Sequence, residues 1–358
     1  MSIPSRRWPK RSRSSPGRPL PSAMESIDVH FHVVPPAFLE AVRRGTFRQV
    51  MELQRRGGRE FTVYHAPANV VVEPDNEVDP RLSDERLMLE GLDRRRLDAA
   101  AIGPSPGQFF YWADPDLGER IARLMNGGIA ALAKAHGERM VGLGTLPMQD
   151  GGRAARELER GVTQLGLRGF EICTHINGRD LDDPGLLPVF EAAARLRAPL
   201  FLHPQNWGEM RRLRDYHLWN LVGFRTETAL AAARLIVGGV FERCPDLTVI
   251  LAHGGGYFPY QIGRLDHGYR VRPELHDRLP RRPSEYLGGI YCDSLTHNAP
   301  ALRFLVDRLG DDHVVIGTDY PFDMGDETPV ETVRACGLGR EREARVLGGN
   351  LTRLLRLG

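Results

Sequence analysis

The chain has 358 residues, of which 41% are hydrophobic and 26% are charged, a composition that excludes global disorder and allows a large buried core. The formal net charge is +2, but residues 1–23 carry six basic side chains and no acid, so residues 24–358 carry −4 and nucleic acid is not the expected partner. No apolar run approaches the roughly 18 residues that a membrane-spanning helix needs, so we expect no membrane partner either.

The first segment, residues 1–23, contains many serine and proline residues besides its six basic side chains. This composition is typical of a disordered segment, because it offers no periodic apolar residues with which to pack. We therefore predict a disordered basic N-terminal extension at 1–23 and one folded domain at 24–358. No stretch with the composition of a linker divides the longer segment.

From residue 24 onward, short apolar runs rich in β-branched residues alternate with longer helical stretches. This alternation is typical of repeated βα units around a parallel sheet. Eight runs can be counted, which is the number that closes a (β/α)8 barrel, the TIM barrel, so we predict this fold of the α/β class. In chain order the expected strands are 27–32, 99–102, 140–145, 167–173, 199–203, 248–253, 290–293 and 314–319.

Helix start and stop signals lie between these runs. Asp114 and Asp183 each precede a proline, which is the favoured combination of an N-cap residue and a first helical residue. The spacing of apolar residues predicts further helices at about 225–243 and 298–309. The second of these precedes Gly310, a residue suited to the end of a helix.

The interval 33–81 breaks this rhythm, because it is too long for a βα loop. It contains strand-like pieces at 61–65 and 70–73. We interpret the interval as a small insertion after the first strand, placed beside the mouth of the barrel.

The four cysteines are widely spaced and form no C-x-x-C pair. We expect Cys173, Cys244, Cys292 and Cys336 to be buried thiols in a reducing compartment, which predicts a cytoplasmic protein.

Four histidines and one aspartate lie where the predicted strands end. His30 and His32 are two residues apart in the first strand, so their side chains point to the same face. His203 ends the fifth run, His253 ends the sixth and Asp319 ends the eighth. In a (β/α)8 barrel the C-terminal ends of all strands meet on one face, where active sites are built. We therefore expect these five residues to lie close together.

Histidine nitrogens combined with one carboxylate form a donor set for a divalent transition metal. Each residue alone could be a hydrogen-bonded core residue, but five such residues at the same end of different strands favour a shared site. We predict one divalent ion per subunit, with zinc as the first choice and manganese, iron and cobalt as alternatives.

Six stretches carry a resemblance that covers most of the chain. They are IDVHFH at 27–32, GGVFE at 238–242, AHGGG at 252–256, GR at 263–264, PSEY at 283–286 and GTDYPF at 317–322. Together they resemble the amidohydrolase superfamily, and within it the decarboxylase family typified by aminocarboxymuconate-semialdehyde decarboxylase.

The resemblance implies a role for each strand-end residue. His30, His32, His203 and Asp319 would hold the metal together with a water molecule, and Asp319 would also take part in catalysis. His253 would be the catalytic acid/base beside that water. The roles are chemically compatible, because a divalent cation lowers the pKa of bound water toward about 7 and an imidazole can take or return the proton.

The resemblance also implies residues that bind a small carboxylate substrate. Arg264 matches an arginine that reaches the carboxylate from the neighbouring subunit of a homodimer, a task that suits the guanidinium fork. Phe322 matches an aromatic residue of the pocket. Where the family has tryptophan this chain has Gln205, with Trp207 two positions further on, and no second substrate-binding arginine stands at 60–79. These departures favour a related carboxylated ring or diene over the muconate semialdehyde itself.

Three functional hypotheses follow. The first is a metal-dependent, non-oxidative decarboxylase of an unsaturated or aromatic carboxylic acid. The second is a metal-dependent hydrolase or hydratase, acting on an amide, a lactone or an alkene, because the fold and ligands alone do not separate these reactions. The third is a metal-stabilised protein without catalytic activity, against which an open water position at the metal argues.

Overall fold

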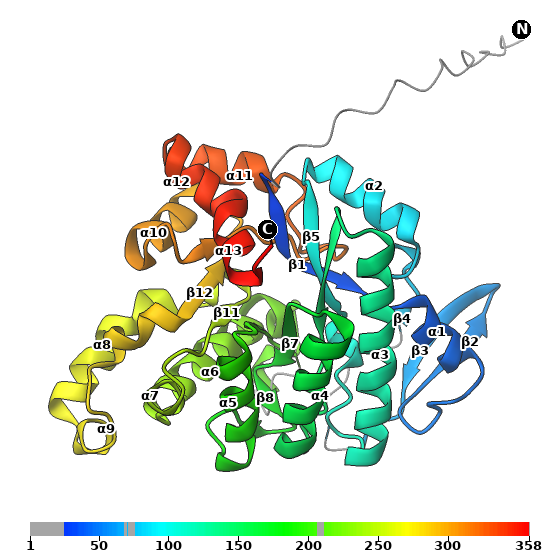
Figure 1. Cartoon of the computed structure of the whole chain (residues 1–358), viewed down its shortest axis with the longest axis horizontal. Coiled ribbons are helices and arrows are strands. Elements are labelled where there is room, and N and C mark those ends of the chain that lie inside the picture. Colours follow the sequence, from blue (N-terminus) through cyan, green and yellow to red (C-terminus); the bar gives the residue numbers. More distant parts are fainter. Residues whose placement is uncertain (1–24, 68–69, 71–75, 206–210, 358) are drawn as a thin grey trace, which may run out of the picture.

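The computed structural model describes residues 25–67, 70, 76–205 and 211–357. Its centre is an eight-stranded sheet in the order β1-β5-β6-β7-β10-β11-β12-β13, and every pair of neighbours is parallel (Figure 1). All eight predicted runs contribute strands to this sheet. The strands are β1 (Ile27–Val33), β5 (Ala99–Pro104), β6 (Met140–Gly144), β7 (Gly169–Cys173), β10 (Leu200–His203), β11 (Val249–Leu251), β12 (Ile290–Asp293) and β13 (Val314–Val315).

The sheet closes between its first and last strands. Beyond β13 the chain continues alongside β1, where the N–H of Val29 donates to the carbonyl of Ile316 at 3.0 Å. Further along, the N–H of His32 donates to the carbonyl of Tyr320 at 2.9 Å, and Phe31 forms a parallel bridge with Tyr320. These contacts confirm the predicted (β/α)8 barrel.

Two layers of apolar packing support the barrel. A large cluster fills the space between the strands and the surrounding helices. A smaller cluster fills the interior and packs against Leu351 and Leu355 of α13 (Asn350–Leu355). The interior members from the strands and their ends are Ile27, Val29, Ala99, Ala101, Val141, Leu143, Phe201, Ile250, Ala252, Tyr291 and Val315.

Two of the segments between the strands begin at the predicted caps, Asp114 and Asp183. The carboxylate of Asp114 accepts from the first N–H groups of α3 (Pro115–Ala135), and Asp183 caps the short 3-10 helix η3 (Pro184–Leu186) that leads into α5 (Leu187–Leu196). Asn298 caps α10 (Ala299–Leu309), which ends before Gly310 as expected. The other helices that follow strands include α4 (Gly151–Leu165) and α8 (Phe258–Val271).

The helix expected at 225–243 is two helices. The first is α6 (Arg225–Val237), and the second is α7 (Val240–Arg243). Gly239 adopts φ 73° between them, a left-handed conformation that interrupts the hydrogen-bond pattern of an α-helix. At Gly238 a side chain would meet Asp182 at 2.2 Å, so the glycine pair also allows close packing on a neighbouring loop.

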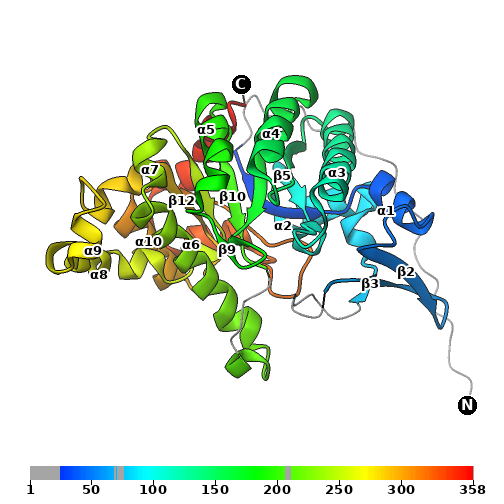
Figure 2. The same ribbon diagram turned by 90° about the horizontal axis from the view of Figure 1, so that it is seen from below.

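The insertion after β1 contains a helix and a small antiparallel sheet. Helix α1 (Pro36–Arg43) is followed by β2 (Met51–Arg56), β3 (Arg59–Tyr64) and β4 (Asn76–Glu77), paired in that order. The predicted piece at 61–65 belongs largely to β3, whereas 71–73 lie outside the described residues. Figures 1 and 2 show this unit beside α3, at the opposite end of the molecule from α8. The domain limits at 24 and 358 stay a prediction.

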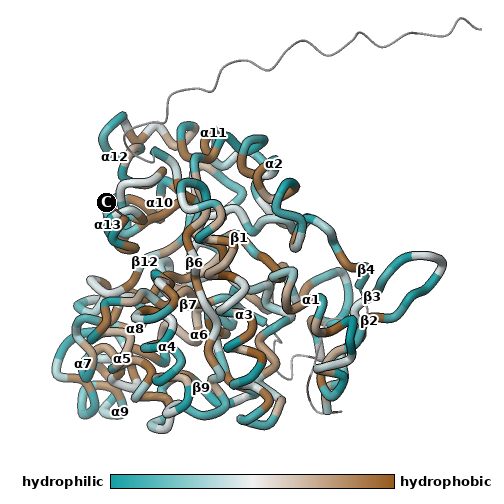
Figure 3. Tube along the Cα trace, turned by 45° about the vertical axis from the view of Figure 1, so that its right-hand side comes forward, coloured by the Kyte–Doolittle hydropathy of each residue, from teal (hydrophilic) through white to brown (hydrophobic). Residues whose placement is uncertain are grey.

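Hydrophilic residues lie at the periphery of the molecule. Figure 3 shows hydrophilic colour on the tip of the β2–β3 hairpin and around α9 (Pro273–His276). Among the described residues, no helix has both the length and the apolar character needed to cross a membrane. All four cysteines are buried free thiols, as predicted.

A buried carboxylate stabilises the contact between β1 and the segment after β13, where the barrel closes. Asp28 accepts from the backbone N–H of His30 and Thr318 and from the Thr318 hydroxyl, and both Asp28 and Thr318 are fully buried. Thr318→Val removes one donor and should lower the free energy of unfolding by about 1–3 kcal/mol in urea titrations. Thr318→Ser keeps the hydroxyl and is the control, and equal loss in both variants would contradict this role.

Candidate metal centre

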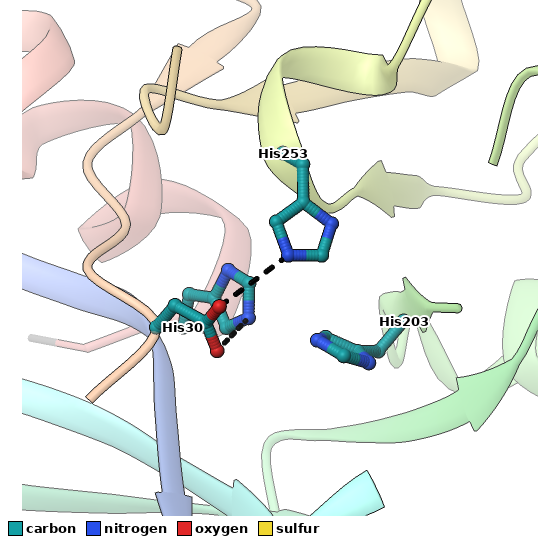
Figure 4. A group of neighbouring side chains, drawn as sticks. His30, His203 and His253 are labelled. Carbon is teal, nitrogen blue, oxygen red and sulfur yellow. Dashed lines mark ion pairs between the residues drawn. The ribbon is translucent and has the colours of Figure 1, made fainter. Parts of the chain in front are cut away.

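The strand-end residues converge at one end of the barrel. Figure 4 shows His30, His203 and His253 around a common centre, coming from the ends of three different strands. One ligand atom from each of these histidines and one from Asp319 all lie within 4.8 Å of one another, and all four residues are buried. This arrangement has the size expected of residues that share one metal ion.

His32 adjoins the same group. Its Nε2 lies 3.1 Å from Oδ1 of Asp319, while Nε2 of His30 lies 3.2 Å from the same oxygen. Nε2 of His253 lies 3.5 Å from the other carboxylate oxygen of Asp319. The ring of His32 is 4.9 Å from the rings of His30 and His203, measured between centroids. The structure therefore brings all five predicted residues together around Asp319.

The first histidine is held in place by a carboxylate that sequence reasoning did not select. Nδ1 of His30 lies 2.7 Å from Oδ2 of Asp293, and Asp293 also accepts from the backbone N–H of His253 and Gly254. Asp293 therefore fixes the ring of His30 and the turn that carries His253. Its position at the end of β12 was a usable signal, because it matches the position of the other site residues.

Several buried histidine nitrogens are available to bind a metal ion. Nδ1 of His32 lies 3.1 Å from the carbonyl oxygen of Pro104, which leaves its Nε2 directed at Asp319. Nε2 of His30 and both ring nitrogens of His203 are buried without a hydrogen-bond partner. Unpartnered polar atoms are costly in a protein interior, and a divalent cation would satisfy them. Imidazole and carboxylate donors suit zinc or manganese.

Electrostatics distinguish His30 from the other histidines. Burial lowers the pKa of His30, but the carboxylates of Asp319 and Asp293 outweigh burial and raise this pKa to about 10. Burial opposes ionisation of Asp319, yet the surrounding histidines hold its pKa well below the usual range. The metal-free site thus keeps a proton between two carboxylates, and a divalent cation would replace that proton.

The pKa of His253 is shifted in the opposite direction, downward. Burial and the positive charge of Arg225 lower the pKa of His253 to about 4, so its imidazole is neutral near pH 7. Arg225 is the first residue of α6, and its guanidinium donates to the carbonyl of Asn220 at 3.0 Å. Arg225 carried no sequence motif that marks it as part of a site, because its approach to His253 depends on how α6 packs.

Two site residues have unusual backbone conformations. His253 has φ 57° and Asp319 has φ 58°, values in the left-handed region that non-glycine residues seldom adopt. The glycines after His253 form a tight turn, in which a side chain at Gly256 would meet the backbone oxygen of Arg225 at 2.2 Å. This turn is packed against protein, so it is not an opening through which a substrate would approach the backbone.

A cavity of about 580 Å³ leads to the centre. His203 and Asp319 line it, and so does Phe322, whose ring lies 5.3 Å from the ring of His32. The insertion contributes part of the wall, and the segment before α6 contributes another part. The lining residues from these two segments include Met51, Thr62, Tyr64, Trp219, Asn220 and Phe224.

The other two predicted substrate residues are Arg264 and Trp207. Arg264 is exposed on α8 and does not belong to the cavity wall within one subunit. Trp207 lies outside the described residues. Of the two predicted substrate residues that the structure describes, Phe322 is therefore the one beside the centre.

Known proteins were compared with the chain. The chain matches the amidohydrolase family over residues 27–357. It is 36% identical over 337 residues to the 2-amino-3-carboxymuconate-6-semialdehyde decarboxylase of Dictyostelium discoideum, an alignment that covers 92% of this chain and 91% of that protein.

Solved structures of decarboxylases share the fold of this chain. The 5-carboxyvanillate decarboxylase of Sphingomonas paucimobilis superposes with a TM-score of 0.78 at 29% identity, covering 94% of this chain and 100% of that one. A dihydroxybenzoic acid decarboxylase from Polaromonas sp. JS666, solved with bound manganese, superposes with a TM-score of 0.73 at 23% identity, covering 93% and 97%. Since the family match spans nearly the whole chain and these relatives are decarboxylases, the chain belongs to the amidohydrolase family and, within it, to the metal-dependent decarboxylases.

Proposed function

We propose that the chain removes the carboxyl group of an unsaturated or aromatic carboxylic acid as CO2, without a redox cofactor. The observation that carries the proposal is the group of buried histidines around Asp319 at the inner end of a cavity. The named substrates of the relatives support the substrate class, because they are conjugated or phenolic carboxylates. The hydrolase alternative has no comparable support among these relatives.

We assign His30, His32, His203 and Asp319 to the metal and His253 to proton transfer. The bonds from Nδ1 of His30 and Nδ1 of His32 support the first part, because they leave each Nε2 facing Asp319. Zinc suits this donor set, and the manganese in the Polaromonas enzyme makes manganese the second choice.

When bound, a divalent cation supplies positive charge that stabilises developing negative charge and lowers the pKa of a nearby water. The protein's own groups handle the proton. His253 is neutral near pH 7, so it can first take a proton and then deliver it to the carbon that loses the carboxyl group. The carbon–carboxyl bond breaks, its electron pair is delocalised into the conjugated system, and a proton replaces CO2 at that carbon.

We propose a homodimer in which Arg264 reaches the partner's substrate. Tyr257, the N-cap residue of α8, is followed at steps of three and four residues by Tyr260 and Arg264, so the three side chains share a helix face. Tyr260 is 74% exposed, and its ring lies 6.0 Å from that of exposed Phe304 on α10. This exposed aromatic surface supports burial against a second subunit. The buried thiols support a cytoplasmic location.

Loss of a ligand should remove the metal. We expect about one divalent ion per wild-type chain, and much less in His30→Ala, His203→Ala or Asp319→Ala, because each variant opens the coordination shell. Elemental analysis after dialysis measures this. His313→Ala changes a histidine outside the group and should keep the ion, whereas a wild-type protein that takes up no transition metal would refute the site.

The reaction itself can be tested with conjugated and phenolic carboxylates. Metal-loaded enzyme in D2O should release CO2 and place one deuterium at the former carboxyl carbon, in equal amounts, because a solvent-derived proton replaces the carboxyl group. Mass spectrometry and a CO2 assay measure both products without added oxygen or nicotinamide. Ring opening or amide cleavage with all carboxyl carbon retained would establish the hydrolase alternative instead.

Replacing the acid/base should separate catalysis from metal binding. His253→Ala should keep the ion yet lose about 10² to 10⁴-fold in kcat, the usual contribution of general acid/base catalysis. Metal content and turnover are measured on the same sample. If the ion is lost as in His30→Ala, His253 is a ligand and the assignment of His32 must be reconsidered.

Subunit mixing tests the role of Arg264. Arg264→Ala and His253→Ala should each be inactive, and mixed dimers should regain activity because one site contains both wild-type residues. Arg270→Ala on the same exposed helix is the control and should remain active as a homodimer. Absence of recovery after verified subunit exchange would place Arg264 outside the partner's site.

A further inference from the structure

One buried carboxylate beside the centre has no role in the reaction described above. Glu171 lies in the middle of β7 and is 1% exposed. Its Oε1 is buried and has no hydrogen-bond partner. An uncompensated charge in a protein interior costs several kcal/mol, on the order of the stability of a domain, so a nearby positive charge or donor is required.

The other acids at the centre are compensated. Asp28 accepts from Thr318 and from a backbone N–H, and Asp293 accepts from His30 and from two backbone N–H groups of the following turn. Asp319 faces the histidines. Among these carboxylates, only Glu171 has an oxygen that is buried without a donor in the described part of the chain.

The group nearest to this oxygen is a metal-ligand candidate. Oε1 of Glu171 lies 3.6 Å from Nδ1 of His32, the nitrogen that also faces the carbonyl oxygen of Pro104. Burial raises the pKa of Glu171 to about 7, and the charges of His32 and His30 partly offset this increase. Glu171 therefore interacts with the side of His32 that is turned away from Asp319.

The neighbouring strand leaves space for this carboxylate. Gly103 on β5 pairs with His32 on β1, and a side chain at Gly103 would meet Oε2 of Glu171 at 2.2 Å. Any larger residue would push the carboxylate away from His32. The glycine is thus required by the close approach of Glu171 to the seam between β1 and β5.

We propose that Glu171 is a positioning residue for His32. Its carboxylate faces Nδ1 of His32 at 3.6 Å, beside the carbonyl of Pro104, and its negative charge keeps Nε2 directed at the metal and strengthens His32 as a ligand. Asp293 holds Nδ1 of His30 at 2.7 Å, so two ligands from one strand each face an acid from another strand. The inference rests on the proposed function, because it requires His32 to bind the metal.

The test measures metal binding by the full-length protein. Glu171→Gln keeps the shape but removes the charge, and it should weaken Mn²⁺ binding about 10 to 100-fold in competition with a chelator. The visible spectrum of the Co²⁺-loaded variant should shift, since the electron donation from His32 to the metal changes. The thermal midpoint of the metal-free variant should not fall below that of the wild type, a result that a merely structural role would not produce.

Glu157→Gln provides a matched control. Glu157 is another buried carboxylate, but it lies on α4 and accepts from Asn126 and Arg160, away from the centre. This variant should lose stability while keeping wild-type affinity for Mn²⁺ and an unchanged Co²⁺ spectrum.

Gly103→Ala tests the contact between Glu171 and His32 by placing a methyl group against the carboxylate of Glu171. It should displace Glu171, weaken Mn²⁺ binding and add little to the effect of Glu171→Gln in the double variant, because both changes remove one interaction. Wild-type affinity and an unchanged Co²⁺ spectrum in both single variants would overturn the role of Glu171 and leave the proposed function intact. A wild-type protein that binds no metal would overturn the proposed function itself.

Discussion

The carboxylate of Asp293 is the contact on which the rest of the site depends. It accepts from His30 on β1 and from the two N–H groups that open the turn after β11, so it connects three segments that are far apart in the sequence. The bond to His30 directs one ring nitrogen at Asp319. The bonds to the turn hold His253 in a backbone conformation that is strained for a non-glycine residue.

The centre gathers far more ionisable side chains than a dry interior normally accepts, and it does so by pairing them. Histidines lower the pKa of Asp319, carboxylates raise the pKa of His30 to about 10, and Arg225 helps to lower the pKa of His253 to about 4. These opposite shifts separate two kinds of histidine. His30 is held between two carboxylates, whereas His253 is neutral near pH 7, as its proposed role in proton transfer requires.

Parts of the chain outside the barrel form much of the cavity wall. The small sheet of the insertion and the segment before α6 supply wall residues such as Tyr64, Thr62 and Trp219, while the barrel supplies the metal-binding end. The same chemistry can therefore be kept while the wall changes. The segment 60–79, which lacks the arginine of the family, contributes to this wall, which is why the substrate is proposed as a class.

The sequence by itself determined the eight strands, the helix caps at Asp114 and Asp183 and the five residues at the centre, because strand periodicity and N-cap chemistry are local and because strand ends meet in a closed barrel. It missed the break at Gly238 and Gly239, where close packing interrupts a pattern that reads as continuous helix. Only the tertiary structure decided that Asp293 and Glu171 face two of the metal-ligand candidates and that Arg225 approaches His253. Those contacts depend on strand register and helix docking between distant segments, which no local pattern records.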